Sequence, residues 1–132
     1  MLAAVNFASS EIIVNEVMPH INNSLGNEWI ELYNNGTLEA ILDNWTVDDD
    51  NFDSITILPG QYIIIARELT DGTDADNDSF ESIWGNNDRV WNLTDGNYSA
   101  VDGVLSLTNG NYTIALKNGS GSLMNSAIII PH

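Results

Sequence analysis

A chain of 132 residues has the length of a single domain and can enclose one hydrophobic core. Its 19 acidic residues outnumber three basic ones, and a formal net charge of −16 excludes an ordinary nucleic-acid-binding surface, because such surfaces need clustered Lys and Arg. The absence of cysteine excludes disulfides and thiolate metal sites, and no apolar run reaches the ~18–20 residues of a membrane span, so we expect no membrane insertion.

The residue pattern predicts an all-β sandwich. Short β-branched and aromatic runs are separated by Gly, Asn, Asp and Pro clusters, and helical periodicity is hard to find. Residues 62–66 are almost continuously apolar, as expected for a central strand buried on both faces. In the strand at 27–34, Ile30 and Leu32 should lie on the face opposite to Trp29. In chain order, the predicted strands and short extended pieces are 11–18, 27–34, 38–42, 45–47, 55–58, 62–66, 89–93, 101–107, 112–117 and 123–130.

Turn signals separate these strands. Pro59-Gly60 is a strong turn dipeptide, and Asn109-Gly110 predicts a hairpin between the strands at 101–107 and 112–117. Residues 68–87 are polar, acidic and contain Gly, so we expect a long loop there.

Glycosylation sequons are unusually frequent. With 18 Asn and 19 Ser plus Thr in the chain, chance predicts about two or three Asn-x-Ser/Thr acceptors, whereas the sequence has eight. Sequons matter only to a chain that meets a glycosylation machinery outside the cytoplasm, so the excess favours a secreted glycoprotein. Clustering of Asn, Ser and Thr in turns is the alternative explanation. The candidate acceptors are Asn22, Asn35, Asn44, Asn77, Asn92, Asn97, Asn111 and Asn118.

Several motifs follow one another in a definite order. They are 13–17 (Ile-Val-Asn-Glu-Val), 28–34 (Glu-Trp-Ile-Glu-Leu-Tyr-Asn), 42–47 (Leu-Asp-Asn-Trp-Thr-Val), 57–64 (Ile-Leu-Pro-Gly-Gln-Tyr-Ile-Ile), 89–91 (Arg-Val-Trp) and 107–116, a late hairpin followed by the turn at 118–121. In this order they resemble the lamin-tail domain family. The resemblance implies an immunoglobulin-like β-sandwich of eight or nine strands and a non-catalytic domain. Such domains are nuclear in animal lamins and appended to secreted or surface proteins in prokaryotes, and the sequons and acidity favour the second group. The near absence of basic residues argues against a nucleic-acid role.

The resemblance also sets the expected domain limits. We expect residues 11–132 to form one lamin-tail-like domain with a long acidic loop near 68–87. Residues 1–10 lack a basic n-region and are too short for a full signal peptide, so they are either a signal remnant or an ordinary disordered terminus. The abrupt ending at 128–132 suggests excision from a larger protein with other domains.

The acidic stretch at 71–81 is the candidate metal site. Alternating carboxylates in a loop can bind Ca²⁺, which takes six to eight oxygen ligands. An EF-hand register starting at Asp74 fails, because position six is Ser79 and position twelve is Gly85. A looser Ca²⁺ loop and a solvated acidic loop both remain open, and the run at 48–50 with Asp53 has the same two interpretations. The candidate ligands are Asp74, Asp76, Asp78 and Glu81.

Aromatic residues offer a different kind of site. Trp29, Trp45 and Trp91 lie on predicted strands and are expected to fill the core. Trp84 lies in the predicted loop, which makes it the best candidate for contact with a ligand such as a sugar.

An enzyme is not expected. The only histidines are His20 and His132, so a catalytic triad or a histidine zinc site lacks its residues. Glu28 and Glu31 are three positions apart on a predicted strand and would face opposite sides, which argues against a glycosidase pair.

We therefore expect a non-catalytic extracellular or cell-surface module that mediates protein contacts or spaces the domains of a larger protein. Its partner would be a protein or a surface glycan, and we expect no cofactor other than Ca²⁺. The alternative is a calcium- or carbohydrate-binding module that uses the acidic 71–81 loop and Trp84.

Overall fold

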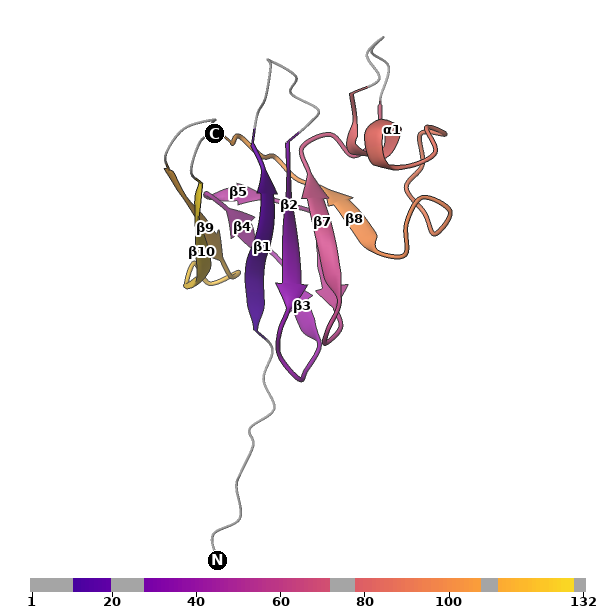
Figure 1. Cartoon of the computed structure of the whole chain (residues 1–132). Helices are drawn as coiled ribbons and strands as arrows, with labels where there is room; N and C mark the ends of the chain where they lie inside the picture. The colour runs from indigo at the N-terminus through magenta and orange to yellow at the C-terminus, as the bar shows by residue number, and fades with distance from the viewer. Residues whose placement is uncertain (1–10, 20–27, 72–77, 108–111, 130–132) are drawn as a thin grey trace, which may run out of the picture.

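The structure, a computed structural model, describes residues 11–19, 28–71, 78–107 and 112–129 (Figure 1). Within these ranges the chain forms ten short strands and one five-residue helix, so the all-β prediction is confirmed. The elements are β1 (Ile12–Met18), β2 (Trp29–Asn34), β3 (Ala40–Leu42), β4 (Thr46–Val47), β5 (Asp50–Asn51), β6 (Ile55–Ile57), β7 (Tyr62–Ala66), α1 (Phe80–Trp84), β8 (Ser99–Asp102), β9 (Tyr112–Lys117) and β10 (Leu123–Ile129).

The strands form two four-stranded sheets and one small sheet. The first sheet has the order β1-β2-β7-β8 and the second the order β10-β9-β4-β5, while β3 pairs with β6. In Figure 1 the first sheet faces the viewer, and β9 and β10 lie to its left. The named strands pair antiparallel except β7 and β8, which are parallel. The two sheets also meet at their edges, where the Val14 amide donates to Asn125 Oδ1 at 3.0 Å.

The main core lies between the sheets. Ile30 and Leu32 of β2 are fully buried there, as their alternation in the sequence predicts. Ile63 and Ile65 of β7 enter the same core. The other sheets contribute Ala40, Leu42, Val47, Ile57, Ile114 and Leu116.

Strand β7 is buried on both faces, as its apolar run predicts. Ile63 and Ile65 point into the main core, and Ile64 and Ala66 point to the opposite side. There they pack against Phe80 in a second, smaller cluster. Helix α1 and the segment that follows it therefore cover the outer face of the sheet, above the end of β7 in Figure 1.

Four local predictions are wrong. Residues 89–93 form no strand, because side chains take up their backbone amides and Arg89 has a φ of 70°. The strand expected at 101–107 begins at Ser99 and ends at Asp102. Gly103 then passes so close to Ile65 that an added Cβ would lie 2.5 Å from its Cγ2.

The third wrong prediction is the hairpin between 101–107 and 112–117. β8 pairs with β7, whereas β9 pairs with β10 and β4, so the two expected partners belong to different sheets. The Asn109-Gly110 turn itself lies outside the described residues. In addition, the segment at 68–87, expected to be loop throughout, contains helix α1.

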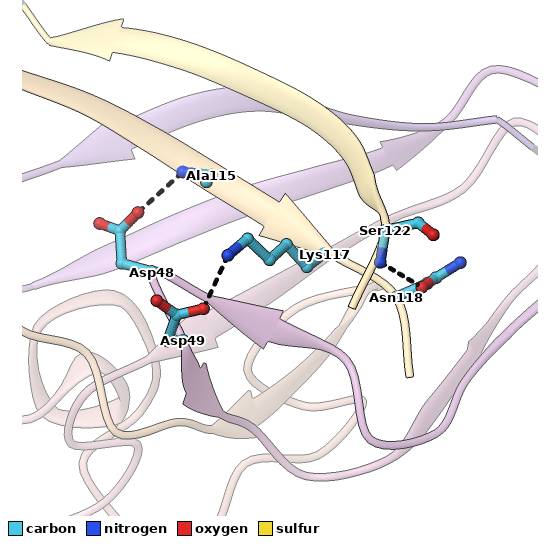
Figure 2. Close-up of polar contacts among 6 residues, drawn as sticks. All are labelled: Asp48, Asp49, Ala115, Lys117, Asn118 and Ser122. Carbon is cyan, nitrogen blue, oxygen red and sulfur yellow. Dashed lines mark hydrogen bonds and ion pairs between the residues drawn. The ribbon is translucent and has the colours of Figure 1, made fainter. Parts of the chain in front are cut away.

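The acidic run at 48–50 builds a tight turn between β4 and β5. Asp48 and Asp49 have φ angles of 51° and 67°, as both central residues of a type I′ turn require. Figure 2 shows how the turn is fastened to β9: Asp48 Oδ1 accepts the Ala115 amide at 2.7 Å, and the exposed Asp49 pairs with Lys117 Nζ at 2.9 Å. The Asp48 amide also donates to the Ala115 carbonyl at 2.9 Å.

We predict that Asp48→Ala lowers the free energy of unfolding by about 1–3 kcal/mol. The substitution leaves the Ala115 amide without its acceptor, and alanine is less favourable than aspartate at a positive φ. Asp49→Asn should change it by less than about 1 kcal/mol, since an exposed ion pair contributes little. Urea unfolding of both variants measures the difference. Equal losses would contradict the assignment of the Asp48 carboxylate as the anchor.

Candidate functional site

Phe80 is the centre of an aromatic cluster on the outer face of the first sheet. It is buried, and its ring lies 5.1 Å from that of Trp91 and 6.0 Å from that of Trp29, centroid to centroid. Trp84 and Tyr98 follow at 6.3 and 6.5 Å. Aromatic pairs in tilted and edge-to-face arrangements of this kind add to the stabilisation from burial alone.

Helix α1 presents this cluster because its start is well fixed. Ser79 is the N-cap, and its Oγ accepts the Ser82 amide at 3.1 Å. The Phe80 amide donates to the Glu68 carbonyl and the Glu81 amide to the Leu69 carbonyl, both at 2.9 Å. These bonds hold α1 against the segment that leaves β7.

The segment after α1 folds around buried and half-buried carboxylates. Glu81 is fully buried, and its two oxygens accept the amides of Asp88 at 2.9 Å and Arg89 at 3.1 Å. Asn87 and Arg89 both have positive φ, and successive amides in such a conformation form a concave binding site for an anion. Asp95 accepts two further amides from the same segment. Irregular backbone thus obtains its hydrogen-bond partners from carboxylates.

A pocket of about 230 Å³ opens beside the aromatic cluster. Its walls combine aromatic rings with the carboxylates of Glu16 and Glu31. Trp84 lines it and has 53% of its surface exposed, so the residue singled out from the sequence is available to a ligand. It lies on α1 rather than in a loop. The lining residues are Glu16, Trp29, Glu31, Tyr62, Ile64, Phe80, Trp84 and Tyr98.

The ionisation of two pocket residues is altered by their surroundings. Burial raises the pKa of Glu31 above its ordinary value of 4.5, and the neighbouring Glu16 raises it further, while a hydrogen bond from Asn15 opposes the change. Burial also raises the pKa of the Tyr98 hydroxyl, with Tyr62 adding to the effect. The pocket therefore holds a carboxylate whose charge is only partly compensated by the protein.

Among the described residues, two groups of three carboxylates bring oxygens within 4.8 Å of one another. One consists of Glu68, Asp71 and Asp78, and the other of Glu81, Asp88 and Asp95. The predicted ligands Asp78 and Glu81 thus belong to different groups. Asp74 and Asp76 lie outside the described residues. The sequence did not point to Glu68, because it lies ten positions before Asp78 and outside the acidic run.

The described sequons lie on the surface. Asn35, Asn44, Asn92 and Asn97 are exposed. Asn118 is half-buried, and its Oδ1 accepts hydrogen bonds in the turn between β9 and β10, including one from Ser122 (Figure 2). Asn22, Asn77 and Asn111 lie outside the described residues, as do both histidines.

The comparison with family models gives one match, to the Lamin Tail Domain, over residues 6–128. The chain belongs to the lamin tail domain family. The resemblance seen in the sequence motifs is thereby confirmed, together with the immunoglobulin-like β-sandwich, and lamin tail domains are generally non-catalytic. A comparison with curated proteins gave no match. Within the described part of the chain, no helix has the length and apolar character needed to cross a membrane.

Of this lamin tail domain's pocket, the sequence pointed to Trp84 alone. Glu16, Glu31 and Tyr62 come from three strands that are adjacent only in the folded sheet. The same-face alternation of Trp29 and Glu31 on β2 was the available signal, since both line the pocket.

We predict that Glu31→Gln stabilises the domain at neutral pH and not in acid. Because the folded-state pKa of Glu31 is raised, its contribution to stability is present below pH 4.5 and is lost as the pH rises through the folded-state pKa. The free energy of unfolding of the variant should therefore rise relative to that of the wild type as the pH increases from 4.5 through the folded-state pKa of Glu31. Urea unfolding between pH 3.5 and 7 measures the difference.

Glu39→Gln, at an exposed glutamate, is the control for removing one negative charge from an acidic protein. A Glu31→Gln advantage no larger than that of Glu39→Gln would contradict the prediction.

Proposed function

We propose that this lamin tail domain is an extracellular or cell-surface module of a larger protein and that it binds a protein partner through the pocket beside Trp84. The observation that carries the proposal is the combination of exposed aromatic surface and carboxylates in one pocket. The occupant that fits this chemistry is a basic side chain, Lys or Arg, projecting from the partner.

Aromatic faces and carboxylates attract the same kind of group. A guanidinium or ammonium is attracted to the face of a Trp or Tyr ring and also pairs with a carboxylate. Glu31 is only 9% exposed and lies beside Glu16, so burial and the neighbouring carboxylate raise its pKa, and a bound cation would favour its ionised form. A volume of about 230 Å³ suits one inserted side chain, below the ~300–1,000 Å³ typical of small-molecule sites.

The charge of the whole domain supports a basic partner. A net charge of −16 creates a negative potential that accelerates the approach of a cationic surface. In the described residues, Arg67 pairs with the buried Glu28 at 3.0 Å and Lys117 with Asp49 at 2.9 Å. Two of the three basic residues are thus already engaged within the domain.

The extracellular location is supported by the eight sequons, four of which start at exposed asparagines. An acceptor must lie on the surface to be modified.

A carbohydrate ligand is the second candidate, because the exposed Trp84 ring could also stack on a sugar. It differs from the first in one respect. A neutral sugar gains nothing from ionised Glu31, whereas a basic side chain does.

We predict that a peptide with one central arginine flanked by Gly and Ser binds more tightly than the same peptide with citrulline, an uncharged analogue of arginine. Trp84→Ala and Glu31→Gln should each weaken binding at least about fivefold, or about 1 kcal/mol. Affinity should rise as the pH increases above 4.5, because the cation favours the ionised form of Glu31. Titration calorimetry at fixed ionic strength measures all three effects.

Asp53→Asn removes an exposed charge outside the pocket and is the matched control. Equal binding of the arginine and citrulline peptides would refute the basic-partner proposal. Binding to a neutral glycan that Trp84→Ala abolishes would instead support the carbohydrate candidate.

A further inference from the structure

We propose that Glu68, Asp71 and Asp78 form a binding site for one divalent cation, Ca²⁺, at the base of the segment between β7 and α1. One carboxylate oxygen from each residue lies within 4.8 Å of those from the other two. The inference does not depend on the proposed function, because these residues do not line the aromatic pocket.

The backbone brings the three side chains together. Phe80 and Glu81 donate their amides to the carbonyls of Glu68 and Leu69, so the two ends of the segment run side by side. Asp102 Oδ1 accepts the Leu69 amide at 3.0 Å and ties this base to β8. The backbone thus holds Glu68 and Asp78, which are ten positions apart in sequence, close to each other before any ion binds.

Asp71 supplies the observation that points to a ligand. It is only 4% exposed, and its Oδ1 accepts the Ser79 amide at 3.1 Å. Its Oδ2 is buried and has no hydrogen-bond partner among the described residues. An ionised oxygen that is buried without a partner costs free energy, and two further carboxylates close by add repulsion. A cation among the three groups removes both costs.

The spacing matches the ion. Oxygen ligands lie about 2.3–2.6 Å from Ca²⁺, so ligands on opposite sides of the ion are about 4.6–5.2 Å apart. Three oxygens within 4.8 Å of one another therefore fit around one Ca²⁺ with little movement. Bidentate carboxylates and waters can complete six to eight ligands, whereas Mg²⁺ demands a stricter octahedron and gives up its water reluctantly.

The second carboxylate group does not carry the same inference. Both oxygens of Glu81 accept backbone amides, as do both oxygens of Asp95, and Asp88 Oδ1 accepts the Val90 amide. These carboxylates serve the fold of the segment after α1. The group provides an internal comparison for the experiment.

Ca²⁺ at Glu68, Asp71 and Asp78 would fasten the segment that leads into α1. Ser79, the N-cap of the helix, is bonded to Asp71, and Phe80 anchors the aromatic cluster. Binding of the ion should therefore stabilise the cover over β7.

We predict that 10 mM CaCl₂ raises the melting temperature of the whole chain by about 5–10 °C relative to 30 mM NaCl, which has the same ionic strength. The matched salt is needed because screening alone stabilises a protein with a charge of −16. Calorimetric titration should give one Ca²⁺ per chain with a Kd of about 0.1–1 mM, the range of weak protein Ca²⁺ sites. MgCl₂ should bind at least about tenfold more weakly.

The variant Asp71→Asn distinguishes a role of Asp71 in ion binding from a role in the stability of the fold. The amide keeps an acceptor for the Ser79 N–H and removes one negative charge from the group. The variant should melt in EDTA at the wild-type temperature or above it, and it should lose at least tenfold in Ca²⁺ affinity. Asp78→Asn should lose as much, while Asp53→Asn should bind Ca²⁺ as the wild type does.

Two results would overturn the proposal. One is the absence of a Ca²⁺-specific shift together with no binding heat up to 10 mM. The other is loss of binding in Asp88→Asn with retention in Asp71→Asn, which would move the ion to the second carboxylate group.

Discussion

The burial of β7 on both faces is the constraint on which the rest of the structure depends. Ile63 and Ile65 fill the space between the sheets, but Ile64 and Ala66 would face water if nothing covered the opposite side. Phe80, brought in by α1, provides that cover. Because α1 has only five residues, it leaves part of this face of the sheet open, and the aromatic pocket lies between α1 and the sheet. Core formation and the candidate binding site are thus two consequences of one apolar strand.

The acidity of the chain is partly structural. With three basic residues for 19 acidic ones, most carboxylates cannot form ion pairs. Several accept backbone amides instead: Asp48 from Ala115, Asp102 from Leu69, and Glu81 from Asp88 and Arg89. Hydrogen bonds to a charged acceptor are stronger than neutral ones, so a carboxylate can replace a missing strand partner in irregular backbone. This is how the segment from 85 to 98 keeps a defined shape outside helix and sheet.

Agreement between sequence and structure follows the range of the interactions. The burial of Ile30 and Leu32 in β2 and the burial of β7 on both faces were predictable, because alternation and apolar runs along a strand are local properties. The strand expected at 89–93 failed because side chains accept its backbone amides. Asp88 accepts the amide of Val90, Asp95 that of Asn92, and Glu81, eight residues away, that of Arg89. The hairpin at 109–110 failed because sheet pairing is decided by the packing of whole layers.

Composition, the spacing of apolar residues and the order of the motifs were enough to indicate the β-sandwich, its family, the burial of β7 on both faces and the surplus of negative charge. Which carboxylates lie together depends on how the chain folds in three dimensions. Glu68 joins Asp71 and Asp78 because the backbone at 68–69 is hydrogen-bonded to that at 80–81, and Glu16 joins Glu31 because β1 pairs with β2. Electrostatic sites depend on distances of a few ångströms between residues remote in sequence. Those distances are set by long-range strand pairing and packing, which the local residue pattern does not specify.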